Sequence, residues 1–138
     1  MKVLKFGGSS VANSERIREV KKLIDSESLP VIVIVSAFQG VTDTLKALSE
    51  SAAGHDPGYQ TRLEELINMH RRVCSELLSG ETLEATLVSI NEIFTELTET
   101  LNGLFLLREL SKSSLDKALS TGERVSSIIL SAFLEHSI

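Results

Sequence analysis

The chain has 138 residues, of which 42% are hydrophobic, so it has the length of one domain and enough apolar side chains for a buried core. Its net charge of −5 argues against a nucleic-acid surface, and no apolar run approaches the roughly 18 residues of a membrane span. Lys5 and Gly7-Gly8 interrupt the start of the chain, where a secretory signal would need an apolar core. The single cysteine, Cys74, cannot form an internal disulfide and indicates a small buried residue. We therefore expect a soluble, acidic, cytoplasmic protein with no nucleic-acid or membrane partner.

The most informative segment is Lys5 to Ser10, with the sequence Lys-Phe-Gly-Gly-Ser-Ser. It follows a strand-like run and precedes a helical pattern, so a lysine and two glycines are predicted at a strand-to-helix turn. Glycine lets backbone amides approach a large anion, and the N-terminus of the following helix adds partial positive charge. A lysine beside such a turn supplies the charge that a transferring phosphoryl group needs. The segment is either this phosphate-binding turn or an ordinary turn with a lysine in solvent.

A second strand is predicted after Pro30, where Val31 to Val35 is an unbroken run of β-branched residues. Such a run is typical of a parallel strand that helices bury on both faces. Between the two strands, Asn13 is a candidate N-cap for a helix with an apolar stripe. Strand, helix and strand in this order predict a βαβ unit with a right-handed crossover, which belongs to the α/β class.

The rest of the chain is predicted to be almost wholly helical. A turn at 54–58 separates the first two of these helices, and Gly80 is a candidate C-cap for the second. Leucine-rich spacing of four and three from Leu83 to Leu101 indicates a helical hairpin or, alternatively, a surface for a partner helix. The apolar stripes that define the helices are Leu45–Ala52, Leu63–Leu78, Leu83–Leu101 and Val125–Phe133. Because two strands do not make a stable parallel sheet, we expect the chain to be the first portion of a larger α/β domain.

Two further segments carry polar groups suited to a ligand. Ser36 to Asp43 follows the second strand, at the edge where open α/β sheets bind ligands, although Thr42 could simply cap the next helix. Glu123 and Arg124 project about 100° apart on a helix. The carboxylate can hold an ammonium group and the guanidinium can hold a carboxylate, which together suit an amino acid. A solvated helix face is the alternative for this pair.

Taken together, the three segments resemble the aspartate kinase family in order and spacing, and the resemblance runs the length of the chain. The motifs are Lys-Phe-Gly-Gly-Ser-Ser at 5–10, Val-Ser-Ala followed by Gly-Val-Thr-Asp at 35–43, and Ser-Thr-Gly-Glu-Arg-Val-Ser-Ser at 120–127. The resemblance implies the amino-acid kinase (carbamate kinase-like) fold, of which this chain would be the N-terminal part, with a parallel-strand core and a large helical portion. The opening residues and the leucine-rich 103–110 region look most like bifunctional aspartokinase–homoserine dehydrogenases.

The resemblance also implies a reaction, the ATP-dependent phosphorylation of the L-aspartate side-chain carboxylate to 4-phospho-L-aspartate. ATP would act as its Mg²⁺ complex, and NADP would be used only by a fused dehydrogenase. This step opens lysine, threonine and methionine synthesis. Carried over by motif, the catalytic residue is Lys5, the ATP and phosphate contacts are Lys5, Phe6, Gly7, Gly8 and Ser9, and the aspartate contacts are Ser36, Thr42, Glu123 and Arg124.

Kinase domains of this family are considerably longer than the chain. We therefore expect residues 1–138 to be the substrate-side portion of a homo-oligomeric enzyme, without the nucleotide-binding half or regulatory domains, and inactive alone. The alternatives are a helical interaction module without catalysis, and another amino-acid kinase that acts on glutamate or carbamate.

Overall fold

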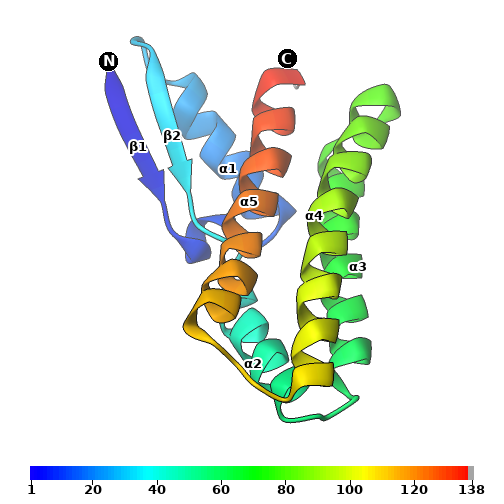
Figure 1. Ribbon diagram of the computed structural model, residues 1–138. Coiled ribbons are helices and arrows are strands. Elements are labelled where there is room, and N and C mark those ends of the chain that lie inside the picture. The colour runs from blue at the N-terminus through cyan, green and yellow to red at the C-terminus, as the bar shows by residue number, and fades with distance from the viewer. Residues whose placement is uncertain (137–138) are drawn as a thin grey trace.

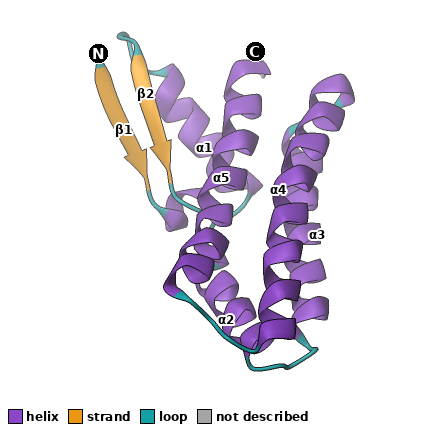
Figure 2. Ribbon diagram, in the orientation of Figure 1, coloured by secondary structure: helices purple, strands orange, loops and turns teal. Residues whose placement is uncertain are grey.

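The computed structural model describes residues 1–136, in which a small parallel sheet lies beside a bundle of helices (Figure 1). Figure 2 shows how far helix outweighs strand, in agreement with the predicted helix-rich α/β chain. The elements are β1 (Lys2–Phe6), the 3₁₀ helix η1 (Gly8–Val11), α1 (Ser14–Asp25), β2 (Val31–Val35), α2 (Val41–Ala53), α3 (Tyr59–Leu77), α4 (Gly80–Leu107) and α5 (Lys112–His136).

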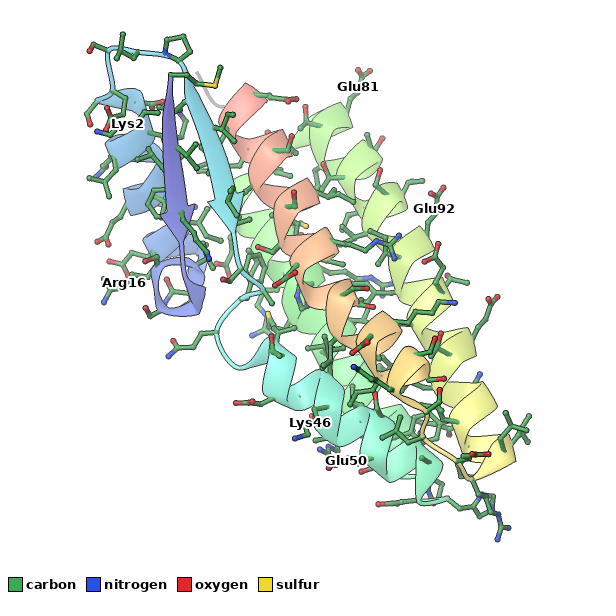
Figure 3. The ribbon with its side chains drawn as sticks, turned by 60° about the vertical axis from the view of Figure 1, so that its left-hand side comes forward. Lys2, Arg16, Lys46, Glu50, Glu81 and Glu92 are labelled. Carbon is green, nitrogen blue, oxygen red and sulfur yellow. The ribbon has the colours of Figure 1, made fainter. Side chains whose placement is uncertain are left out.

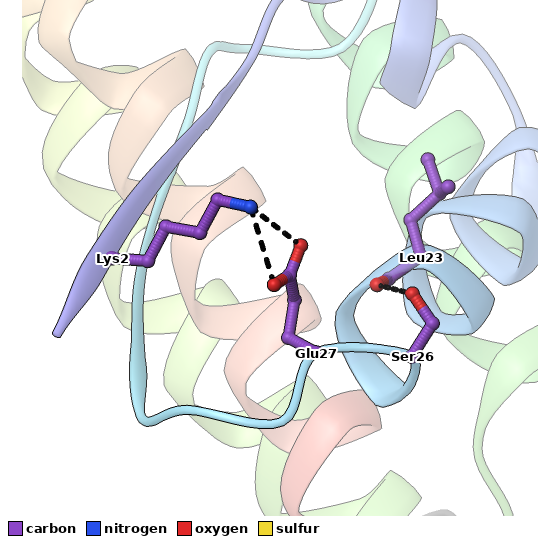
Figure 4. A network of polar contacts seen from close by, with 4 residues as sticks. All are labelled: Lys2, Leu23, Ser26 and Glu27. Atoms are coloured by element: carbon purple, nitrogen blue, oxygen red, sulfur yellow. Dashed lines mark hydrogen bonds and ion pairs between the residues drawn. The ribbon is translucent and has the colours of Figure 1, made fainter.

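The predicted βαβ unit is present, with β1 and β2 paired in parallel from Lys2 opposite Val31 to Phe6 opposite Val35. Asn13 caps α1 as expected, because its Oδ1 accepts a hydrogen bond of 2.9 Å from the backbone N–H of Arg16. At the other end of the unit, Lys2 Nζ lies 3.1 Å from Glu27 Oε1, which ties the start of β1 to the α1–β2 connection (Figure 4).

Only one face of the sheet is covered, so the prediction that β2 is buried on both faces is wrong for this chain. Val31, Val33 and Val35 are half-buried toward the helices, whereas Ile32 and Ile34 are 48% and 47% exposed. Successive strand residues point to opposite faces, and residues 1–136 supply helices to one face only. A parallel sheet normally has both faces covered, so this outer face is an uncovered apolar surface.

The predicted helical hairpin is formed by α3 and α4, which lie side by side with α2 and α5 packed against α4 (Figure 1). The seam of α4 is buried within this bundle, with Ile90 and Leu101 at 0% exposure and Phe94 at 3%. Because the seam is used inside the chain, it is not the partner surface considered as an alternative. Gly80 is not the C-cap of α3, since it has a positive φ of 59° but begins α4.

Charged side chains of the helices lie on the outside of the bundle, as the labelled Lys46, Glu50, Glu81 and Glu92 show (Figure 3). The one cysteine, Cys74, is buried in α3 as expected, and burial raises the pKa of its thiol to about 11. Among residues 1–136, no helix combines the length and the apolar character needed to cross a bilayer.

Candidate functional site

The lysine–glycine turn lies at the carboxyl end of β1, directly beside the end of β2. The backbone N–H of Ser36 donates to the carbonyl of Phe6 at 3.0 Å, which locks the two strand ends together. A Cβ atom on Gly8 would lie 3.5 Å from the carbonyl oxygen of Ala37, so the turn and the loop after β2 are in contact. A Cβ on Gly7 would meet nothing within 4 Å, so this position opens to solvent with room for a ligand.

The helix that follows the turn differs from the prediction. The short η1 comes first, with the N–H of Ser10 donating to the carbonyl of Gly7 at 3.1 Å, and α1 begins only at Ser14. The Asn13 side chain caps the start of α1. The expected contribution of a following α-helix dipole at Gly7 and Gly8 is therefore wrong, because that helix starts too far along the chain. The groups available to an anion at this turn are instead the backbone amides of the turn itself.

The loop after β2 runs from Ser36 to Gly40 and turns sharply into α2. Gly40 has a φ of 82°, in the left-handed region that favours glycine, and it occupies the N-cap position of α2. Thr42 is therefore not the helix cap considered as an alternative. It lies on the exposed first turn of α2, at the same end of the sheet as Ser36.

Helix α5 packs directly onto this loop, and a glycine allows the close approach. A Cβ on Gly122 would lie 2.8 Å from the Cβ of Ala37, closer than real side chains approach, and 3.0 Å from Cγ1 of Val41, which is tighter than most real contacts. One turn further along α5, the buried Ser126 hydroxyl donates to the carbonyl of Ser36 at 2.8 Å. These two contacts fix the Glu123 segment of α5 relative to the end of β2. The structure thus brings the three predicted segments together.

Glu123 and Arg124 lie in an open groove between α5 and β2, which is also lined by Val33, Ile34 and Val35. The Arg124 guanidinium donates to Glu96 Oε2 of α4 at 3.0 Å, and both side chains are about half exposed. An ion pair this exposed contributes little stability, so it opens readily. The Glu123 carboxylate has no hydrogen-bonding partner among the described residues.

Lys5 lies on β1, one strand away from this groove. Its neighbour Phe6 is half-buried toward the helices, so alternation along β1 puts the exposed Lys5 on the outer face, next to its register partner Ile34. The site residues therefore lie around the carboxyl end of the sheet, with Lys5 on its outer face and Glu123 in the groove between β2 and α5. Within residues 1–136, the side chains of Lys5, Ser36, Thr42 and Glu123 form no hydrogen bond or ion pair with one another or with a neighbour.

Beneath the loop lies a buried histidine that the sequence indicated only as part of an apolar stripe. The ring of His70, on α3, stacks on that of Phe38 with centroids 5.2 Å apart and planes inclined by 17°. Its Nδ1 lies 2.8 Å from the carbonyl oxygen of Leu66, and its Nε2 is buried without a partner in the described residues. Burial lowers the pKa of His70, because the charged ring would lose its hydration.

Comparison with known proteins supports the resemblance found in the sequence. The model of the amino acid kinase family matches residues 1–137. The chain is 32% identical over 136 residues to the chloroplastic bifunctional aspartokinase/homoserine dehydrogenase 1 of Arabidopsis thaliana, and 35% identical over 137 residues to aspartokinase 1 of the same plant. These alignments include 98% and 96% of this chain, but 15% and 23% of the two relatives.

Solved structures give the same result for the fold. E. coli aspartokinase III in complex with lysine and aspartate matches with a TM-score of 0.85 and 25% identity, over 98% of this chain and 29% of that one. The complex of aspartokinase III with aspartate and ADP matches with a TM-score of 0.83 and 25% identity, over the same shares of the two chains. The predicted family resemblance and fold are thereby confirmed, and the chain spans less than a third of the proteins it matches.

Proposed function

Since this chain belongs to the amino acid kinase family, we propose that it forms the aspartate-binding side of an enzyme that phosphorylates L-aspartate with ATP. A side-chain carboxylate oxygen would attack the γ-phosphorus of ATP, giving 4-phospho-L-aspartate and ADP. The observation that carries this proposal is the convergence of three polar segments at one edge of the sheet, with Ser126 and Gly122 holding two of them together. Relatives named as aspartokinases, one of them bound to aspartate and ADP, support the choice of substrates.

For the phosphoryl group, the proposal assigns Lys5 and the backbone of the turn from Phe6 to Ser9. Phosphoryl transfer needs little covalent chemistry from the protein, since positioning and neutralisation of charge lower the barrier. The Lys5 ammonium would stabilise the charge that develops on the transferring group. The amides of Gly7, Gly8 and Ser9 would donate to phosphate oxygens, and the open space beside Gly7 fits a large anion.

For aspartate, the proposal assigns the amino group to Glu123 and the carboxylates to the hydroxyls of Ser36 and Thr42. A carboxylate without an existing partner can accept charged hydrogen bonds from an ammonium group without first breaking an ion pair. Arg124 would reach a substrate carboxylate only when its exposed pair with Glu96 opens.

No group of three or more His, Cys, Asp or Glu side chains within the described residues is placed to hold a metal ion. Mg²⁺ commonly keeps waters and binds through substrate phosphates, so the proposal assigns it to ATP and gives this chain no metal ligand. NADP enters only if the full polypeptide carries a homoserine dehydrogenase, as the names of the bifunctional relatives suggest. A homo-oligomeric enzyme and a cytoplasmic location remain predictions.

The proposal is tested by measuring ADP release from the full polypeptide encoded by the gene, with L-aspartate, L-glutamate or carbamate as acceptor. We expect turnover with L-aspartate and no turnover by the 138-residue chain alone. Lys5→Ala should lower kcat about 10²- to 10³-fold with little change in the KM for aspartate, because the lost charge matters most in the transition state.

Lys2→Ala is the matched control, since Lys2 lies on the same strand but pairs with Glu27. It should leave kcat nearly unchanged. A preference for glutamate or carbamate would replace the substrate assignment, and a near-normal kcat for Lys5→Ala would remove this lysine from the mechanism.

A further inference from the structure

A histidine is unusual at the buried position that His70 occupies. Its ring is fully buried, and Nδ1 lies 2.8 Å from the Leu66 carbonyl oxygen. Because a carbonyl only accepts, Nδ1 carries the proton and donates it, which leaves Nε2 as a lone pair without a partner in residues 1–136. A buried, unsatisfied acceptor destabilises a fold relative to an apolar side chain of the same shape. The histidine therefore requires an explanation other than filling space.

The contacts of the ring indicate what it does. One face of His70 stacks on Phe38, while Phe94 of α4 meets it edge-on with centroids 5.3 Å apart at 64°. The hydrogen bond to Leu66 fixes the orientation of the ring, so the face it presents to Phe38 is fixed too. No other side chain of the loop from 36 to 40 is buried more deeply than Phe38, which is 3% exposed.

Phe38 is in turn the residue that shapes the loop. Its carbonyl accepts from the N–H of Val41 at 3.0 Å and so forms the turn into α2. Its neighbours on either side make the other contacts of the site: Ala37 packs against Gly122, and Gln39 approaches Gly8. A change in the packing of the Phe38 side chain therefore moves the backbone that carries Ser36.

We propose that His70 is a positioning residue, which holds residues 36–42, the loop after β2 and the start of α2, in their binding geometry by fixing the position of Phe38. The expected effect on aspartate binding rests on the proposed function, whereas the positioning of the loop by His70 does not. The ring stays neutral at neutral pH, since burial lowers its pKa, and a neutral ring can stack on Phe38 without a buried charge. His70 touches neither substrate directly, so its removal should weaken aspartate binding rather than the chemical step.

The test compares His70→Leu with His55→Leu, a control of matched chemistry. His55 also stacks on a phenylalanine, Phe105, with centroids 4.1 Å apart at 17°, and its Nδ1 also lies 2.9 Å from a backbone carbonyl. It lies at the turn between α2 and α3, at the opposite end of α2 from the loop (Figure 1). Phe38→Leu removes the same stack from the loop side, and it keeps the test decisive if His70→Leu fails to fold.

Two readouts are needed in the full polypeptide. Hydrogen exchange of the backbone amides at 36–42 should become faster in His70→Leu and Phe38→Leu but not in His55→Leu. The KM for aspartate should rise about tenfold or more, with kcat and the KM for ATP within about twofold, because small misplacements of binding groups have large effects. The variant that carries both His70→Leu and Phe38→Leu should have a KM for aspartate no higher than that of the more affected single variant, since both substitutions remove the same interaction.

Unchanged exchange at 36–42 in the two loop variants would overturn the inference. The inference would also be overturned if kcat fell and both KM values rose by the same factor, in proportion to the loss of thermal stability. If the wild-type enzyme does not phosphorylate aspartate, the proposed function fails, and the exchange measurement still decides whether His70 seats the loop.

Discussion

Replacing Gly122 by alanine tests how closely α5 packs on the loop after β2. The added Cβ would lie 2.8 Å from Ala37 Cβ, 3.0 Å from Val41 Cγ1 and 3.3 Å from Leu45 Cδ1. Alanine in a helix interior stabilises by about 1 kcal/mol relative to glycine, whereas overpacking a core destabilises by about 1–3 kcal/mol. Ala37 has no flexible side chain to move aside, so the backbone must shift, and the cost of overpacking should exceed the gain in helix propensity. We expect a net loss of about 1–2 kcal/mol in the free energy of unfolding, measured by urea denaturation.

A matched control and a rescue make this prediction specific. Gly103 lies within α4, and a Cβ there would meet nothing within 4 Å, so Gly103→Ala should stabilise the chain by up to about 1 kcal/mol. Adding Ala37→Gly to Gly122→Ala removes the closest clash and should recover part of the loss, as a double-mutant cycle would record. An unfolding free energy for Gly122→Ala at or above that of the wild type would refute the close packing of α5 on the loop after β2.

Three other predictions concern the 138-residue chain itself. Its stability should fall as the pH drops through 6.5, because burial lowers the pKa of His70 in the folded chain, so that below this pH the unfolded chain binds a proton that the buried ring does not. It should also fall as the pH rises from 9 toward 11, where the unfolded chain loses the Cys74 proton more easily, and Cys74→Ala should abolish this alkaline loss in denaturation curves. The uncovered outer face of the sheet should make the chain self-associate in sedimentation, and Ile34→Lys should weaken that association, so a monodisperse wild-type monomer at high concentration would contradict it.

Periodicity and capping chemistry predicted the elements of this fold well. The β-branched run from Val31 to Val35 and the Asn13 cap located β2 and α1, since both signals depend on local backbone preferences. The seam from Leu83 to Leu101 predicted the buried face of α4, because a helix that packs closely repeats its apolar residues every three to four positions. The order of the three polar motifs then identified the family.

The features that assemble the site could not be predicted in the same way, because they depend on contacts between distant residues. Gly122 looks like an ordinary helical glycine until α5 meets Ala37, and nothing near Ser126 in the sequence marks its bond to Ser36. The burial of β2 was overestimated, because a β-branched run reports the preference of a strand and not whether a helix covers each face. His70 fits an apolar stripe by position, and only its contact with Phe38 distinguishes it.

The central claim, that the three segments form an aspartate site, is tested most directly by Glu123→Gln in the full polypeptide. The neutral amide keeps the shape of the side chain but loses the charged hydrogen bond to the substrate ammonium, which contributes about 1.5–3 kcal/mol. The KM for aspartate should therefore rise about 10- to 150-fold with the KM for ATP unchanged, while Glu92→Gln on the outer surface of α4 leaves both unchanged. An unaltered KM for aspartate, or an equal rise for both substrates, would contradict the account.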